Sequence, residues 1–182
     1  MIANTETKGI IMLSSHQEVL HQAINLLSDI SKDDYVEIRQ PYFSSSIGEH
    51  FRHVLDHFAA LQLGHDQGFV NYNIRNRHSQ IELFPELAKI QFTALQNWLG
   101  KLVENDLNTS FVVESEISIS DKHSVNVTSN LARELLFTTS HAIHHYAMIK
   151  VIRLLQNAEV PTDFGFAPAT LTYLNQNLGS NY

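Results

Sequence analysis

The sequence predicts a mainly helical, all-α protein: a four-helix bundle with a small β-hairpin inserted between the third and fourth long helices. Four long segments repeat apolar residues at the spacing of an amphipathic helix, and only one stretch alternates as a strand does. A lone amphipathic helix cannot bury its apolar stripe, so the four are expected to pack together. A length of 182 residues with 43% hydrophobic and 17% charged residues fits one folded domain, residues 1–182.

The first two helices are expected to begin at capping boxes, in which a serine and a glutamate three residues later satisfy free backbone N–H groups. The first of these helices opens at Ser15, so residues 1–11 are expected to form a loose N-terminal extension. The second opens at Ser46 and ends at Gly64 or Gly68, because glycine readily adopts the conformation that terminates a helix.

The third helix is expected to open at Ser79, again with a glutamate three residues later. From about Phe111 the apolar pattern changes to near alternation, and a short turn then leads into a second strand, which together predict the hairpin. The fourth and longest helix follows a cluster of cap residues ending at Asn130 and continues to about Asn157. A further short helix is expected near Pro168.

The composition argues against several classes of protein. The net charge is −7, with 12 Lys and Arg against 19 Asp and Glu and no basic run, so nucleic acid is not an expected partner. No apolar run is long enough to span a membrane and no signal peptide is recognisable, so we expect a cytoplasmic protein without a membrane partner. Because the chain has no cysteine, a metal would need nitrogen or oxygen ligands, and a reactive thiol would come from a small cofactor.

Histidine clustering is the most informative feature of the sequence. Of eleven histidines, six fall in two short helical windows: His50, His53, His57, His141, His144 and His145. Residues four apart share a helix face, so His141 and His145 point the same way, and the apolar stripe that continues from them turns this face toward the bundle interior. Two neighbouring buried imidazoles favour a shared divalent cation.

The second helix offers a third ligand, but its spacing does not select one residue. On the helical wheel His50 and His57 flank the apolar centre, whereas His53 lies further round. Periodicity alone therefore favours His50 or His57. The competing interpretation is that these histidines serve in packing or lie on the surface, which is common for single histidines.

Two of these stretches resemble the DinB-like (damage-inducible) metalloprotein family. Residues 46–56, SIGEHFRHVLD, resemble the start of the family's second helix, where a ligand histidine follows a Ser or Thr cap by seven residues; here that residue is His53. Residues 140–146, SHAIHHY, resemble its last long helix, where histidines four apart complete the site. The resemblance implies a four-helix bundle, one metal ion on His53, His141 and His145, and frequently a homodimer.

The resemblance also implies an activity on a small-molecule substrate, because family members with assigned activities include thiol-dependent transferases and isomerases. Three protein ligands leave one coordination position open, which is typical of a catalytic metal site. We therefore expect a divalent ion (zinc, nickel or iron) to activate a low-molecular-weight thiol or water for transfer or hydrolysis. The alternative is a non-catalytic metal-binding or structural stress-response protein with the same bundle.

Three more residues are candidates near this site. Glu134 precedes His141 by seven residues on nearly the same face and could orient an imidazole, although a solvated glutamate is equally expected at a helix start. Arg75 and Arg77 lie in the polar loop 71–78 and could bind the carboxylate or phosphate of an anionic substrate. Exposure to solvent is the simpler expectation for both arginines.

Overall fold

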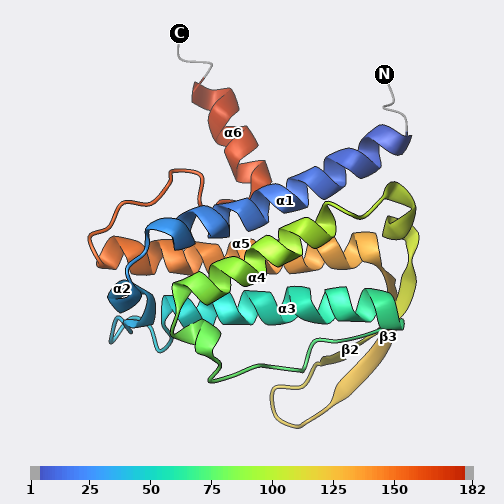
Figure 1. The fold of residues 1–182 in the computed structure, drawn as a ribbon, viewed down its shortest axis with the longest axis horizontal. Helices are drawn as coiled ribbons and strands as arrows, with labels where there is room; N and C mark the ends of the chain where they lie inside the picture. Colours follow the sequence, from blue (N-terminus) through green and yellow to red (C-terminus); the bar gives the residue numbers. More distant parts are fainter. Residues whose placement is uncertain (1–4, 179–182) are drawn as a thin grey trace.

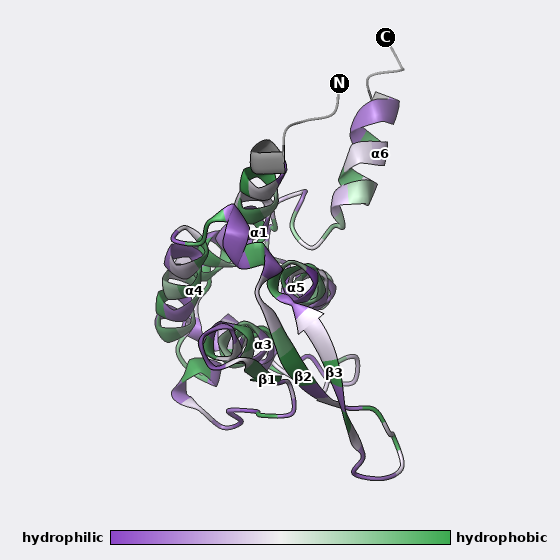
Figure 2. Cartoon of the chain, turned by 90° about the vertical axis from the view of Figure 1, so that its right-hand side faces the viewer, coloured by the Kyte–Doolittle hydropathy of each residue, from purple (hydrophilic) through white to green (hydrophobic). Residues whose placement is uncertain are grey.

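A computed structural model describes residues 5–178 and has the predicted helical architecture (Figure 1). Its four long helices are α1 (Thr5–Asp29), α3 (Ile47–Gln67), α4 (Pro85–Leu99) and α5 (Leu131–Leu155). The contacts pair α1 with α4 and α3 with both α4 and α5 (Figure 2). The shorter helices are α2 (Lys32–Val36), the 3-10 helices η1 (Gln80–Glu82) and η2 (Glu104–Asn108), and α6 (Pro168–Leu178).

The predicted starts of α3 and α5 are confirmed. Ser46 and Glu49 form a complete capping box, in which each side chain accepts a hydrogen bond from the backbone N–H of the other residue. Asn130 caps α5 by accepting a backbone N–H from its first turn. Of the two glycines considered for the end of α3, Gly68 is the terminator, with a φ of 75°, and Gly64 lies inside the helix.

The first helix begins earlier than predicted. It starts at Thr5 rather than at Ser15, and the Ser15 hydroxyl donates to the carbonyl of Ile11 within the helix. A serine inside a helix commonly forms this bond to the preceding turn instead of capping. Residues 5–11, which were expected to be loose, are therefore helical; residues 1–4 of that expected extension lie outside the described residues.

The start of α4 also differs from the prediction. Ser79 makes no capping hydrogen bond, and the residues after it form η1 instead of the first turn of α4. The helix begins at Pro85, which occupies its first position. A proline fits there because the missing N–H is one that a helix start leaves unbonded anyway.

A three-stranded sheet lies beside α3 and α5. Its strands β2 (Ser110–Glu116) and β3 (Ser124–Asn130) form the predicted antiparallel hairpin, and β3 leads directly into α5. A third strand, β1 (Phe69–Asn71), was not predicted; it pairs in parallel with β2 and packs against α3. Three residues are too few for alternation to be recognised in a sequence.

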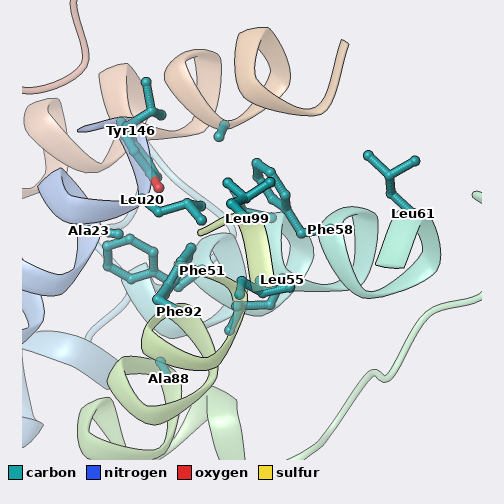
Figure 3. Packing of buried hydrophobic residues seen from close by; sticks show 14 of the residues in the cluster. Leu20, Ala23, Phe51, Leu55, Phe58, Leu61, Ala88, Phe92, Leu99 and Tyr146 are labelled. Carbon is teal, nitrogen blue, oxygen red and sulfur yellow. The ribbon is translucent and has the colours of Figure 1, made fainter. Parts of the chain in front are cut away.

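The apolar core fixes the position of α3 relative to α4 and α5. Phe51 and Phe58 of α3, Phe92 of α4 and Tyr146 of α5 are fully buried (Figure 3). The ring of Phe51 contacts Phe92 and Tyr146 edge-on, with centroids 5.5 and 5.9 Å away. This packing also fixes the side chains that α3 and α5 present to each other. No helix in residues 5–178 combines the length and apolar character needed to cross a membrane.

Candidate metal centre

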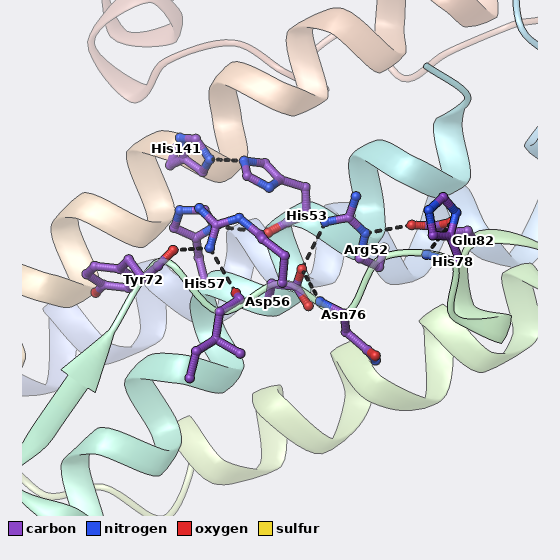
Figure 4. Close-up of polar contacts among 11 residues, drawn as sticks. Arg52, His53, Asp56, His57, Tyr72, Asn76, His78, Glu82 and His141 are labelled. Atoms are coloured by element: carbon purple, nitrogen blue, oxygen red, sulfur yellow. Dashed lines mark hydrogen bonds and ion pairs between the residues drawn. The ribbon is translucent and has the colours of Figure 1, made fainter. Parts of the chain in front are cut away.

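Three histidines from two helices meet in one group. His53 on α3 and His141 and His145 on α5 each offer a ring nitrogen, and these atoms lie within 4.8 Å of one another. The Nε2 atoms of His53 and His141 are 3.0 Å apart (Figure 4), and the His145 ring centroid lies 4.7 and 4.6 Å from those of His53 and His141. The structure thus brings together the three residues that the family resemblance indicates.

The position of α3 explains why His53, rather than a neighbour on the helical wheel, joins this group. The apolar centre of α3 faces the whole core, including α4, whereas a partner for His141 and His145 must face α5. His53 lies at the edge of the apolar face and stays partly exposed, while His50 and His57 are buried. Periodicity located the core face correctly, but this was not the face that completes the group.

His50 contacts the three-histidine group through His145. Its Nδ1 atom is 3.0 Å from Nδ1 of His145, and one of these two nitrogens must carry the shared proton. Nε2 of His145 is free for a ligand when His145 is the donor in this bond, because a neutral imidazole carries only one N–H. An outer hydrogen bond of this kind orients a ligand imidazole and selects its tautomer. His50 is therefore placed to position His145.

His57 contacts two of the three histidines, His53 and His141. Its Nδ1 atom donates to the backbone carbonyl of His53 at 3.0 Å, because a carbonyl can only accept. The His57 ring lies 4.3 Å from that of His141 and stacks on Tyr72 at 5.4 Å, centroid to centroid. His57 consequently packs beside the three histidines and connects them to Tyr72.

Glu134 has neither of the roles considered from the sequence. It is fully buried, not solvated, and its hydrogen bonds go to Tyr72, Ser129 and Arg133 rather than to an imidazole. The Tyr72 hydroxyl donates to Glu134 at 2.8 Å, and the Tyr72 ring in turn stacks on His57. Tyr72 thus links Glu134 to His57. The sequence did not indicate this link, because Tyr72 directly follows the unpredicted strand β1.

Burial keeps the imidazoles of the site neutral. Loss of solvation, together with the neighbouring imidazoles, lowers the pKa of His53 to about 2, of His145 to about 3 and of His57 to about 4. The pKa of His141 is also lowered, mainly by burial. A neutral imidazole has a free lone pair, so protons do not compete with a metal ion for this group near neutral pH.

The loop 71–78 brings one of its two arginines to the site. Arg75 donates to the backbone carbonyl of Tyr72, whose ring stacks on His57, so its guanidinium lies beside the site. Its positive charge also contributes to the lowered pKa values of His53, His57 and His141. Arg77 is exposed and does not act on these histidines. The sequence did not distinguish the two arginines, because nothing local shows which of them faces inward.

The donor set fits a divalent metal ion. Two metal–nitrogen bonds of about 2.1 Å at a tetrahedral angle separate their nitrogens by about 3.4 Å. The 3.0 Å between His53 and His141 is close to that spacing. Within residues 5–178 no fourth histidine or carboxylate joins the group, so one position would stay open to a small molecule. Three imidazoles suit zinc, nickel or iron.

Two solved structures share the fold of this chain. A DinB-like protein from Bacillus cereus superposes with a TM-score of 0.59 at 12% identity, covering 82% of this chain and 93% of that one. A DinB-like protein from Bacillus subtilis superposes with a TM-score of 0.52 at 19% identity, covering 82% and 95%. The chain has the DinB-like fold, and the resemblance found in its sequence is confirmed at the level of the fold.

Sequence comparison adds one partial match. No family model matches the chain. FK506-binding protein 5 from the fungus Rhizopus delemar is 35% identical over 107 residues, which make up 59% of this chain. The match spans only 28% of the length of that relative. The ligand in the relative's name is therefore that of a much longer protein.

Proposed function

We propose that this chain is a metal-dependent enzyme that holds one divalent ion, zinc, nickel or iron, on His53, His141 and His145. The observation that carries the proposal is the convergence of three neutral imidazoles from α3 and α5. The DinB-like fold supports it, because the same fold was expected from motifs that contain these histidines.

The proposed reaction is transfer to, or hydrolysis of, a small-molecule substrate. A divalent ion with an open coordination position lowers the pKa of a coordinated thiol or water, which supplies a nucleophile near neutral pH. Since the chain has no cysteine, the thiol would belong to a low-molecular-weight cofactor. His50 fixes the orientation of the His145 ring, and His57 packs against His141, so the ligand group is held before a substrate arrives.

Metal analysis of untagged protein tests the site. We expect about one metal ion per chain in the wild type, and its loss when His53, His141 and His145 are all replaced by alanine. A control variant replaces three exposed histidines by alanine and should keep its metal: His21, His123 and His144. Wild-type protein that stays metal-free after incubation with zinc, nickel or iron would overturn the proposal.

The alternative of a non-catalytic metal-binding or structural protein predicts a different response to small ligands. In cobalt-loaded protein, an added thiol should change the visible spectrum when one coordination position is open. An unchanged spectrum would indicate a filled coordination shell and favour the structural role. Turnover of ester and thiol-acceptor substrates, abolished in the triple variant but not in the control variant, would then establish catalysis.

From the resemblance we also propose that the protein forms a homodimer, and from its composition that it is cytoplasmic and has no nucleic-acid partner. The net charge of −7 supports the last statement, since it disfavours contact with a phosphate backbone. Sedimentation velocity measures the oligomeric state; a single species near the chain mass of 20.7 kDa would contradict the homodimer.

A further inference from the structure

The loop 71–78 is anchored on both sides of Arg75. On one side, the Asn73 side chain bonds to both strands of the hairpin, accepting from β2 at 2.7 Å and donating to β3 at 3.1 Å. On the other side, the backbone N–H of Asn76 donates to the Asp56 carboxylate of α3 at 3.2 Å (Figure 4). The backbone that carries Arg75 is therefore fixed to the sheet and to α3.

Buried ion pairs hold Asp56, the carboxylate that bonds to Asn76. Arg52 on α3 donates to Asp56 at 2.9 Å and to Glu82 of η1 at 2.8 Å, with all three side chains at most 11% exposed. Glu82 also accepts the backbone N–H of His78 at 3.1 Å. Arg52 thus organises the carboxylates that hold the end of the loop, and their two negative charges exceed its single positive charge.

Arg75, in contrast, is in direct contact with no carboxylate of residues 5–178, although burial lowers its pKa and the charge of Asp56 acts against this lowering. Its Nη1 atom donates to the backbone carbonyls of Tyr72 and Ile74, and none of the ion pairs among residues 5–178 includes it. Its side chain is only half-buried, and an arginine stays protonated in such surroundings. A guanidinium has five N–H donors in a planar fork, so two backbone bonds from a single nitrogen leave donors for a ligand.

Without a metal ion, the charged side chains around the site balance: Arg52 and Arg75 offset Asp56 and Glu82, and Arg133 offsets Glu134. The carboxylates of Asp56 and Glu82 are bonded to Arg52, and that of Glu134 is bonded to its own partners. The neutral imidazoles contribute no negative charge. A divalent ion beside the Arg75 cation would therefore leave a net positive charge in a partly desolvated place, where a nearby anion is bound more strongly than in water.

We propose that Arg75 is a specificity-determining residue, and that the small molecule entering the open coordination position carries a carboxylate that pairs with its guanidinium. This inference rests on the proposed function, because it needs a metal ion on the three histidines. Arg75 would act on binding and orientation, and the fixed loop supplies the preorganisation that makes such a contact selective. Arg77, two residues away and exposed, has no part in this contact.

Two thiols that differ only in their second functional group test the carboxylate contact. Mercaptopropionate and mercaptopropanol have the same chain length, and both can bind cobalt through sulfur, so absorption of the cobalt-loaded protein gives their dissociation constants. We expect wild-type protein to prefer mercaptopropionate by roughly tenfold, as for a charge-assisted hydrogen bond. Arg75→Met should remove this preference while leaving the affinity for mercaptopropanol nearly unchanged.

Arg77→Met is the matched control, because it removes the same charge from the same loop. We expect it to keep most of the preference for mercaptopropionate. Comparing the ratio of the two dissociation constants between the wild type and each variant cancels the intrinsic difference between the thiols. An unchanged ratio in Arg75→Met, or an equal loss in Arg77→Met, would overturn the proposal, since the effect would then be absent or due to long-range charge alone.

Two further variants keep the test decisive if Arg75→Met does not fold, as judged by circular dichroism. Arg75→Lys keeps the charge and should retain part of the preference, whereas Arg75→Gln keeps a neutral donor and should lose most of it. The reverse order would contradict the proposal. A failure of cobalt to bind wild-type protein at all would be a different result, one that contradicts the metal site itself.

Discussion

His16 on α1 is a buried imidazole outside the metal group. It shares one hydrogen bond of 2.8 Å with the Thr139 hydroxyl of α5, and burial lowers its pKa from 6.5 to about 4. Because the folded pKa is the lower one, the unfolded state binds more protons between pH 6.5 and 4. The stability from neutral His16 is thus fully present above pH 6.5 and is lost as the pH falls through this window.

We expect His16→Leu to flatten the pH dependence of stability in metal-free protein. Between pH 7 and pH 5 the wild type should lose roughly 2 kcal/mol more unfolding free energy than this variant, from the two pKa values of His16. Urea denaturation at both pH values measures the difference. His21→Leu, an exposed change on the same helix, should follow the wild type; a His16→Leu curve parallel to the wild type would contradict the argument.

Single residues of the site were predictable to different degrees. The spacing of His141 and His145 is local, and a helix places them together whatever surrounds it. The choice of His53 over His50 and His57 depends on which side of α3 meets α5, which is a tertiary relation, and only the family resemblance indicated it. Local sequence does not show that Arg75 faces the site, because the position of its loop depends on hydrogen bonds to α3 and to the hairpin.

At the scale of elements, α3 and η1 approach so closely that one position requires glycine. A Cβ atom at Gly48 would lie 2.1 Å from the backbone oxygen of Glu82 and 2.8 Å from the Tyr35 ring. The close approach also lets Arg52 of α3 reach Glu82 at 2.8 Å. The glycine therefore sets the spacing between the helix that carries His53 and the segment that ends the Arg75 loop.

We expect Gly48→Ala to destabilise the protein by about 1–3 kcal/mol, since overpacking against a backbone atom outweighs the better helix propensity of alanine. Gly100→Ala is the control: its Cβ would meet the flexible Gln17 side chain at 3.0 Å, which can move away. Urea denaturation of both variants measures the effect. Equal stabilities would mean that η1 shifts freely and that its spacing from α3 is not a constraint.

Of the three helix starts predicted from a serine with a glutamate three residues later, only that of α3 is confirmed. The pattern of serine and glutamate three residues apart marks α3 at Ser46, yet the same pattern at Ser15 lies within α1 and at Ser79 precedes η1. A serine can bond either forward as a cap or back to the preceding turn, and the local sequence does not decide between them. The strand β1 needs β2 as its partner, 43 residues later in the chain (Phe69 pairs with Val112), so no local pattern could reveal it.

At the scale of the whole molecule, the bundle class was predictable because amphipathic spacing and burial depend on the entire length of each helix. The consequence for function is that the three histidines connect two helices far apart in the sequence. His53 comes from α3, while His141 and His145 come from α5, with α4 and the sheet between them in the chain. An ion held by all three would cross-link the folded bundle but could not bind the unfolded chain in the same way.

Metal should therefore raise the thermal stability of the protein. At a free zinc concentration of about 100 times the dissociation constant, linkage adds about 2.7 kcal/mol, or roughly 5–10 °C in Tm for a chain of this size. Calorimetry should show this rise in the wild type and in His144→Ala, but not in the double variant His53→Ala/His145→Ala. Magnesium, which prefers oxygen ligands, should have little effect. An unchanged wild-type Tm in protein that does contain stoichiometric zinc would mean that the ion binds the folded and unfolded chains equally, and hence that it does not join α3 to α5.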